Sequence, residues 1–312
     1  MDQLQDLGSV IPEILGPTYA IYGDLLRQPE VAAAIYKTKR EEYSYGPDPR
    51  QKLDLYSPSQ NNSTSRSRVL IFVYGGGFFS GEKRLSDTLG DEAYANIGHF
   101  FVEQFGFETV VMDYRLTGHG ATYPSGAEDV DLCLRWVAER FGQQSDTFIL
   151  ANSAGAAHVT SWMFGDKWAD GRSGFFDGLR GPKLQAVGLL GCSFRLDPDG
   201  DMKPLLKAYY GTPENTRLSE PTSLMLQAAK IVSRSEVAKW PRIMTIVSEL
   251  DPKEHIIDTG REFATLWEAK GGRGAFVEIM GHNHISPVLS LGTGIAAEEA
   301  WGRDFGNWLI EG

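Results

Sequence analysis

The sequence predicts an α/β fold: a mostly parallel, twisted sheet of eight strands with helices on both faces and a helical cap. Two observations lead to this prediction. Short apolar runs, typical of buried strands, alternate with segments of helical periodicity along most of the 312 residues, which indicates a parallel sheet with right-handed crossovers. The alternation stops at residues 195–240, a segment too long for a simple connection, and an insertion of this size usually forms a cap over one edge of the sheet.

The first part of the chain shows two other patterns. Residues 1–40 carry apolar positions at mixed helical spacing, interrupted by prolines, which predicts one or two short helices that pack against the rest. Residues 42–57 alternate apolar and polar side chains on both sides of a Gly-Pro-Asp-Pro turn, which predicts a hairpin of two antiparallel strands. A surface loop rich in Ser and Asn is expected over residues 57–67.

The remaining elements follow in chain order. Strands are expected over residues 68–74, 107–114, 148–151, 184–191, 242–248 and 275–280. Helices are expected over residues 91–104, from 123 onward, directly after 153, around 205–210 and 223–232, over 256–269 and from about 295 to 310. We therefore expect a single domain over residues 1–312.

Composition and charge exclude several classes of protein. The net charge of −11 and the lack of any Lys- or Arg-rich run argue against a nucleic-acid partner. The first residues carry neither a basic segment nor a long apolar run, so we expect a cytoplasmic protein without a signal peptide or a membrane span. Cys133 and Cys192 lie far apart, in no metal-binding or redox spacing, and are predicted to be small buried residues. We expect no metal ion and no cofactor.

The first candidate for a reactive side chain is Ser153. The apolar run 148–151 ends in Ala151-x-Ser153-x-Gly155 and passes directly into small residues, as in a strand, a tight turn and a helix. Such a turn needs small residues two before and two after the serine, because backbone passes close to both positions. The turn holds its serine in a strained, exposed conformation at a helix N-terminus, which suits a nucleophile. The alternative is an ordinary helix-capping serine.

Three consecutive glycines, Gly75–Gly77, follow the predicted strand 68–74. Glycine loses more backbone entropy on folding than any other residue, so a run of three indicates that bare backbone is needed there. The oxyanion of a tetrahedral acyl-transfer intermediate needs preorganised N–H donors. Gly76 and Gly77 can supply two of them, and Ala154 can add a third from the start of its helix. The alternative is a plain flexible turn.

A serine hydroxyl is a weak nucleophile unless a neighbouring imidazole takes its proton. Ligands of doubly wound sheets bind beyond the carboxyl ends of the strands, and His282 and His284 follow the predicted strand 275–280 at that edge. His284 is the predicted base, and His282 remains the alternative. His99 and His158 fall within predicted helices, where packing or surface roles are expected.

The imidazole in turn needs a carboxylate that fixes its tautomer and stabilises its positive charge. Asp251 follows the predicted strand 242–248 at the same edge of the sheet and is the predicted partner. Glu249 is the alternative.

With these residues the chain resembles the α/β-hydrolase superfamily and, within it, the hormone-sensitive-lipase-like esterases and the arylformamidase-like enzymes. The resemblance covers nearly the whole chain from Tyr45 onward. It rests on the segments Tyr74–Phe78, Asn152–Gly155, Glu249–Pro252 and Gly281–His284 and on the chain order of serine, aspartate and histidine.

The resemblance implies roles for the residues already singled out. The catalytic triad would be Ser153, Asp251 and His284. The oxyanion hole would be formed by Gly76, Gly77 and Ala154. The cap that shapes the substrate pocket would come from residues 1–40 and 195–240.

Three positions depart from the family pattern. Tyr74 stands where the family has a histidine before the glycines, and its phenol can brace the loop by hydrogen bonding instead. Ala151 replaces the first glycine of the serine turn, and Asn152 replaces an aspartate.

The predicted activity is that of a cofactor-free carboxylesterase that works through an acyl-enzyme intermediate. The expected substrate is a small or medium ester or lactone with apolar parts, because the segment 195–240 is rich in Leu, Met and Tyr. The residues predicted to bind the substrate are Phe78, Asn152, Tyr209 and Tyr210.

Other functions fit the same residues. The triad could cleave an amide or formamide, or pass the acyl group to an acceptor other than water, as in a tailoring enzyme of specialised metabolism. A function of another class is a ligand receptor built on a hydrolase scaffold that has lost its activity. Assembly as a homodimer also remains open.

Overall fold

A single eight-stranded sheet forms the centre of the computed structural model, which describes residues 2–59, 66–142, 145–178 and 182–311. The strand order is β1-β2-β4-β3-β5-β6-β7-β8. The strands are β1 (Lys39–Ser44), β2 (Lys52–Ser57), β3 (Ser67–Val73), β4 (Glu108–Met112), β5 (Ser145–Asn152), β6 (Lys183–Leu190), β7 (Arg242–Ser248) and β8 (Gly274–Ile279). β2 pairs antiparallel with β1 and with β4, whereas the other neighbours are parallel. The predicted hairpin and the mostly parallel sheet are confirmed, and of the predicted loop 57–67, residues 60–65 lie outside the described residues.

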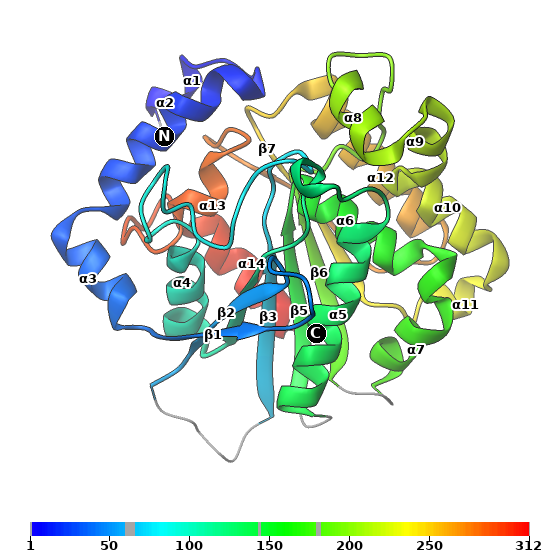
Figure 1. Ribbon diagram of the computed structural model, residues 1–312, viewed down its shortest axis with the longest axis horizontal. Coiled ribbons are helices and arrows are strands. Elements are labelled where there is room, and N and C mark those ends of the chain that lie inside the picture. The colour runs from blue at the N-terminus through cyan, green and yellow to red at the C-terminus, as the bar shows by residue number, and fades with distance from the viewer. Residues whose placement is uncertain (1, 60–65, 143–144, 179–181, 312) are drawn as a thin grey trace.

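The helices lie around this sheet (Figure 1). They are α1 (Asp2–Gln5), α2 (Ile11–Leu26), α3 (Pro29–Lys37), α4 (Ala95–Phe105), α5 (Ser125–Phe141), α6 (Ala154–Phe164), α7 (Ala169–Asp177), α8 (Lys203–Tyr210), α9 (Pro213–Ser219), α10 (Pro221–Ile231), α11 (Arg234–Val237), α12 (Asp258–Ala269), α13 (Ser286–Ser290) and α14 (Ala300–Ile310). Across the described part of the chain, none of these helices combines the length and the apolar character that a membrane crossing requires.

Helices cover both faces of the sheet, as predicted. On one face, Phe101 of α4 packs edge to face against Phe305 of α14. On the other face, Phe164 of α6 packs against Phe263 and Trp267 of α12. The central strands are therefore enclosed, and the apolar side chains of β3 are completely shielded from solvent. This burial on both faces explains why these strands are continuous apolar runs in the sequence.

Three helices begin later than predicted, for local reasons. α4 starts at Ala95 instead of residue 91 because Tyr94 adopts a left-handed conformation, with φ 70°, that a continuous helix does not allow. α12 starts at Asp258, after a π-helical turn over Lys253–Ile257. α14 starts at Ala300 instead of about residue 295, because the Glu299 side chain accepts a hydrogen bond from the Gly294 N–H and holds the preceding residues in a turn.

The segment 195–240 divides between two places. Leu206, Tyr209 and Tyr210 of α8 pack in one apolar cluster with Ala154, the first residue of α6, so α8 lies at the edge of the sheet where β5 ends. α10, in contrast, packs along α6 on the flank of the molecule. At the N-terminal end of the chain, α2 packs against α13, the helix that follows His284. The edge at which β5 ends is thus bordered by α8, and α2 lies beside the segment that carries His284.

Candidate active site

Ser153 occupies a sharp turn between β5 and α6. Its backbone is in a left-handed region, with φ 51° and ψ −117°, which is strained for a residue with a side chain. A Cβ atom at Gly155 would lie 2.5 Å from the carbonyl oxygen of Tyr74 and closer still to that of Val73. Only glycine therefore fits two residues after the serine, which is the close approach that the sequence predicted. The hydrogen bond from the Ser153 N–H to the Leu190 carbonyl, at 2.8 Å, ties the turn to the end of β6.

Three side chains from separate parts of the chain form one hydrogen-bonded series. His284 Nε2 lies 3.1 Å from Ser153 Oγ, and His284 Nδ1 lies 2.7 Å from Asp251 Oδ1. The second carboxylate oxygen of Asp251 accepts a hydrogen bond of 2.7 Å from the Ser248 N–H. Because both carboxylate oxygens are occupied, Asp251 can hold only one orientation. A carboxylate, an imidazole and a hydroxyl in this arrangement can move a proton from the serine to the histidine.

The two alternative residues have other partners. His282 Nδ1 lies 2.9 Å from Ser286 Oγ, and burial lowers the pKa of His282 to about 4. Glu249 accepts a hydrogen bond of 2.7 Å from the Gly281 N–H. Both side chains thus support the loop that carries His284, and neither forms a hydrogen bond with Ser153 among the described residues.

Asn283 is a supporting residue that the sequence did not reveal. It is completely buried, its Oδ1 accepts hydrogen bonds from the Ile285 and Ser286 N–H groups, and its Nδ2 donates to Thr18 Oγ1. The asparagine therefore shapes the turn directly before and after His284 and joins it to α2. The only sign of this role in the sequence was the position of Asn283 between two histidines.

Gly75–Gly77 lie beside Ser153 and take conformations that need glycine. Gly76 has φ 131° and Gly77 has φ 60°. A Cβ at Gly76 would overlap the carbonyl oxygen of Ser80, and one at Gly75 would lie 3.0 Å from Ser153 Cβ. Within the described residues, the N–H groups of Gly76, Gly77 and Ala154 form none of the hydrogen bonds of the turn or its surroundings. In the described part of the chain these three donors therefore have no acceptor and can serve an oxyanion.

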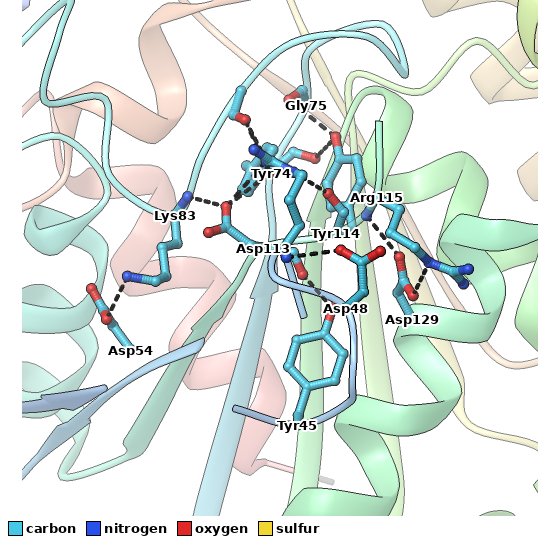
Figure 2. A network of polar contacts seen from close by, with 12 residues as sticks. Tyr45, Asp48, Asp54, Tyr74, Gly75, Lys83, Asp113, Tyr114, Arg115 and Asp129 are labelled. Carbon is cyan, nitrogen blue, oxygen red and sulfur yellow. Dashed lines mark hydrogen bonds and ion pairs between the residues drawn. The ribbon is translucent and has the colours of Figure 1, made fainter. Parts of the chain in front are cut away.

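Tyr74 braces the glycine loop, as the sequence analysis expected of a phenol at this position. Its hydroxyl lies 3.0 Å from Asp113 Oδ1 and 3.2 Å from the Gly81 carbonyl, and it accepts a hydrogen bond of 2.9 Å from Arg50. Figure 2 shows Tyr74 and Asp113 close together below Gly75, with Tyr114 on the other side of Tyr74. The loop therefore rests on a buried polar network.

Of the side chains predicted to bind substrate, the three aromatic ones pack against one another. Phe78 and Tyr209 stack with their ring centroids 4.5 Å apart, and Tyr210 meets Phe78 edge to face. All three are buried and belong to one apolar cluster with Ala154, so they form an apolar wall next to the Ser153 turn. Asn152 is also buried, and its amide donates to the Leu190 carbonyl at 3.4 Å.

His158 lies behind this wall, on α6, as a packed residue. Its ring is edge to face with Tyr114, and its Nδ1 lies 3.2 Å from the Tyr209 hydroxyl. Burial lowers the pKa of His158 from 6.5 to about 3, so the imidazole is neutral in the folded protein at ordinary pH.

This buried histidine predicts a loss of stability in acid. Unfolded His158 binds a proton near pH 6.5, whereas the folded protein does not, so the unfolded state holds more protons below that pH. The free energy of unfolding therefore falls as the pH drops below 6.5, by about 1.4 kcal/mol per pH unit for each such proton. Urea unfolding at pH 6 and at pH 5 gives the change of the unfolding free energy with pH. In His158→Gln this change should be smaller than in the wild type by about 1.4 kcal/mol per pH unit. Equal slopes in the two proteins would contradict the prediction.

Cys133 and Cys192 are both buried and unpaired, and burial raises the pKa of each thiol, as expected of packing residues. Over the described ranges, no three His, Cys, Asp or Glu side chains are grouped so that they could hold a metal ion. A cofactor-free reaction remains a prediction.

Comparison with known proteins gives likenesses in sequence and in fold. A family model described as BD-FAE matches residues 53–170, the part that contains the glycine loop and the serine turn. Acetylcholinesterase 1 of Caenorhabditis briggsae is 30% identical over 129 residues, which are 38% of this chain and 20% of that enzyme. The chain thus matches only a small part of this relative.

Two solved structures match most of the chain. Carboxyl esterase 2 of the mycorrhizal fungus Tuber melanosporum has a TM-score of 0.65 at 18% identity, over 95% of this chain and 99% of that one. Esterase 2 of Thermogutta terrifontis, solved with propionate bound, has a TM-score of 0.60 at 18% identity, over 87% of this chain and 94% of that one. These likenesses, together with the strand order, show that the protein has the α/β-hydrolase fold.

Proposed function

We propose that this protein hydrolyses carboxylic esters, with Ser153 as the nucleophile. The observation that carries the proposal is the hydrogen-bonded series of Asp251, His284 and Ser153, which lies beside backbone N–H groups that have no acceptor among the residues described. The names of the structural neighbours, which are esterases, support the same class of reaction.

The first half of the reaction forms an acyl-enzyme. Ser153 Oγ attacks the ester carbonyl carbon while His284 Nε2 takes its proton. Negative charge then develops on the former carbonyl oxygen, and the N–H groups of Gly76, Gly77 and Ala154 stabilise it; one such donor is typically worth about 3–4 kcal/mol of barrier. Asp251 stabilises the imidazolium. When the tetrahedral intermediate collapses, the bond to the leaving oxygen breaks and His284 gives its proton to the departing alcohol.

The second half repeats these steps with water. His284 takes a proton from a water molecule that attacks the acyl carbon, and the same donors stabilise the second oxyanion. The bond between the acyl carbon and Ser153 Oγ then breaks, and His284 returns the proton to the serine. The products are the alcohol and a carboxylic acid, and the enzyme is regenerated.

We propose a small or medium ester or lactone with apolar parts as the substrate. Phe78, Tyr209 and Tyr210 form an apolar cluster with Ala154, the residue after Ser153, and Leu205 of α8 lies against Gly77. The propionate complex of the T. terrifontis esterase shows a short carboxylate in a protein of this fold. We therefore expect short acyl groups to be preferred.

A panel of p-nitrophenyl esters from acetate to decanoate tests the proposal. The wild type should turn over the short esters, and a fluorophosphonate should label it covalently. Ser153→Ala should lose on the order of 10⁶-fold in kcat and all labelling, because the nucleophile is gone. Ser161→Ala is a matched control, since Ser161 lies on the same α6 helix and its hydroxyl donates to the Ala157 carbonyl.

Two outcomes would overturn the proposal. A wild type that neither turns over esters nor reacts with the fluorophosphonate would exclude a serine hydrolase and favour a ligand receptor. Turnover of anilides or formamides at rates above those of the esters would instead assign the protein to the amidases.

A further inference from the structure

Tyr114, the second residue after β4, has its hydroxyl at an unusual place. It lies 3.1 Å from the Tyr74 carbonyl oxygen and 3.2 Å from the Gly75 carbonyl oxygen, so its single proton is shared between two successive carbonyls. Figure 2 shows the phenol reaching this point from below the loop. The side chain is completely buried, so no bulk water competes for these acceptors.

The Gly75 carbonyl and the Gly76 N–H belong to the same peptide unit. A peptide unit is planar and trans, so its carbonyl and its N–H point in opposite directions and turn together. A donor that holds the Gly75 carbonyl from below therefore also holds the Gly76 N–H toward the opposite side. Glycine by itself offers little resistance to rotation of this plane, because no side chain restricts its dihedral angles.

The next peptide unit is held in a different way. The Gly76 carbonyl accepts hydrogen bonds from the Phe79 N–H, the Ser80 N–H and the Ser80 hydroxyl, at 3.0–3.2 Å. By the same reasoning these bonds fix the direction of the Gly77 N–H. The Gly77 N–H is thus held by hydrogen bonds within the loop itself, whereas the direction of the Gly76 N–H depends on the side chain of Tyr114, just after β4.

We propose that Tyr114 is a positioning residue that directs the Gly76 N–H toward the oxyanion by holding the Gly75 carbonyl. This role rests on the proposed function, since it concerns a donor of the proposed oxyanion hole. Tyr114 touches neither the substrate nor the reacting atoms in this role. It acts through one peptide plane.

The surroundings of Tyr114 suit a fixed donor. Its ring stacks on Tyr74, with centroids 4.5 Å apart, and meets His158 edge to face at 4.7 Å, so the ring has no room to swing away. Burial raises the pKa of Tyr114 far above its usual value, which keeps the proton on the hydroxyl. Arg50 holds the far end of the loop through the Gly81 carbonyl, at 2.8 Å.

Tyr114→Phe tests this role, because it removes the hydroxyl and keeps the stacked ring. Deleting an oxyanion donor typically costs about 10²–10³-fold in kcat, and here the donor stays but is free to turn, so we expect a loss of about 10–50-fold. KM should change less than about twofold, because ground-state binding does not depend on this N–H. The affinity for a trifluoromethyl ketone, whose serine adduct carries an oxyanion, should fall by the same factor as kcat/KM.

Tyr56→Phe is the matched control. Tyr56 is also a buried tyrosine, but it lies on β2 with its ring against Gly98 of α4, away from the glycine loop and from Tyr114. This variant should keep kcat within about twofold. Replacement of Tyr114 by p-aminophenylalanine, which keeps an N–H donor at the same place, should restore most of the activity.

Three results would overturn the role of Tyr114. These are an unchanged kcat in Tyr114→Phe, an equal loss of kcat in Tyr56→Phe, and a failure of p-aminophenylalanine to restore activity when circular dichroism shows that the protein is folded. A failure of the proposed function itself would look different. The wild type would then show no turnover and no labelling by the fluorophosphonate.

Discussion

Replacing His284 with alanine should lower kcat/KM for a short p-nitrophenyl ester by on the order of 10⁵–10⁶-fold. The imidazole lies between Ser153 Oγ and the Asp251 carboxylate, at 3.1 and 2.7 Å, and no other described histidine contacts the serine. Without it, Ser153 has no group that can take its proton, and the leaving alcohol has no proton donor. Steady-state kinetics on purified protein measures the loss.

His282→Ala is the control for this prediction, because His282 lies two residues away in the same loop. Its imidazole is paired with Ser286 and is neutral, since burial lowers its pKa to about 4. Its loss should cost stability, about 1–3 kcal/mol for a buried hydrogen-bonded group, and should change kcat/KM by less than about tenfold. If His282→Ala were inactive while His284→Ala kept its turnover, the roles of the two histidines would be reversed.

The sheet was predictable because each buried parallel strand leaves a local mark. The residues of β3 and β7 are apolar runs that need no knowledge of their neighbours, and β7 occupies residues 242–248 as predicted. The serine turn left an equally local mark, the small residues on both sides of Ser153, although the backbone that excludes a side chain at 155 belongs to Val73 and Tyr74 at the end of β3. Periodicity and close approach are both visible within a short window of sequence.

The support beneath the site was not predictable, because it joins residues from distant parts of the chain. Arg50, Tyr74 and Asp113 meet only when the hairpin, β3 and β4 are assembled. No spacing in the sequence marks such a network, and the same residue types are common on protein surfaces. The choice between His282 and His284 could not be made from spacing alone either, because it depends on the turn that Asn283 stabilises.

The pairing of the aromatic residues shows a third limit. Tyr209 and Tyr210 were predicted to face the substrate because they lie in the segment 195–240. The structure gives both of them packed partners, with Tyr209 stacked on Phe78. Aromatic residues that shape a pocket and those that only fill the space behind it have the same composition, so only coordinates place them against one another.

Gly155→Ala should cause a large loss of stability for a single added methyl group. The new Cβ would lie 2.5 Å from the Tyr74 carbonyl oxygen and closer to that of Val73, and both are backbone atoms of β3's end that cannot move without shifting the sheet. Overpacking of this kind costs about 1–3 kcal/mol and occasionally more, and we expect the upper end, about 3 kcal/mol. Because the strain falls where Ser153 meets the glycine loop, kcat should also fall in the fraction that remains folded.

Gly171→Ala is the matched control for Gly155→Ala. Gly171 lies in helix α7, with only an Arg135 side-chain nitrogen near the site of a new Cβ, at an ordinary contact distance of 3.6 Å. Alanine favours a helix over glycine by about 1 kcal/mol, so this variant should be neutral or more stable. Urea unfolding of the two variants measures the difference. Similar midpoints for both would show that the backbone at Ser153 can relax around a methyl group, and the close approach at Gly155 would then not be what restricts this turn to glycine.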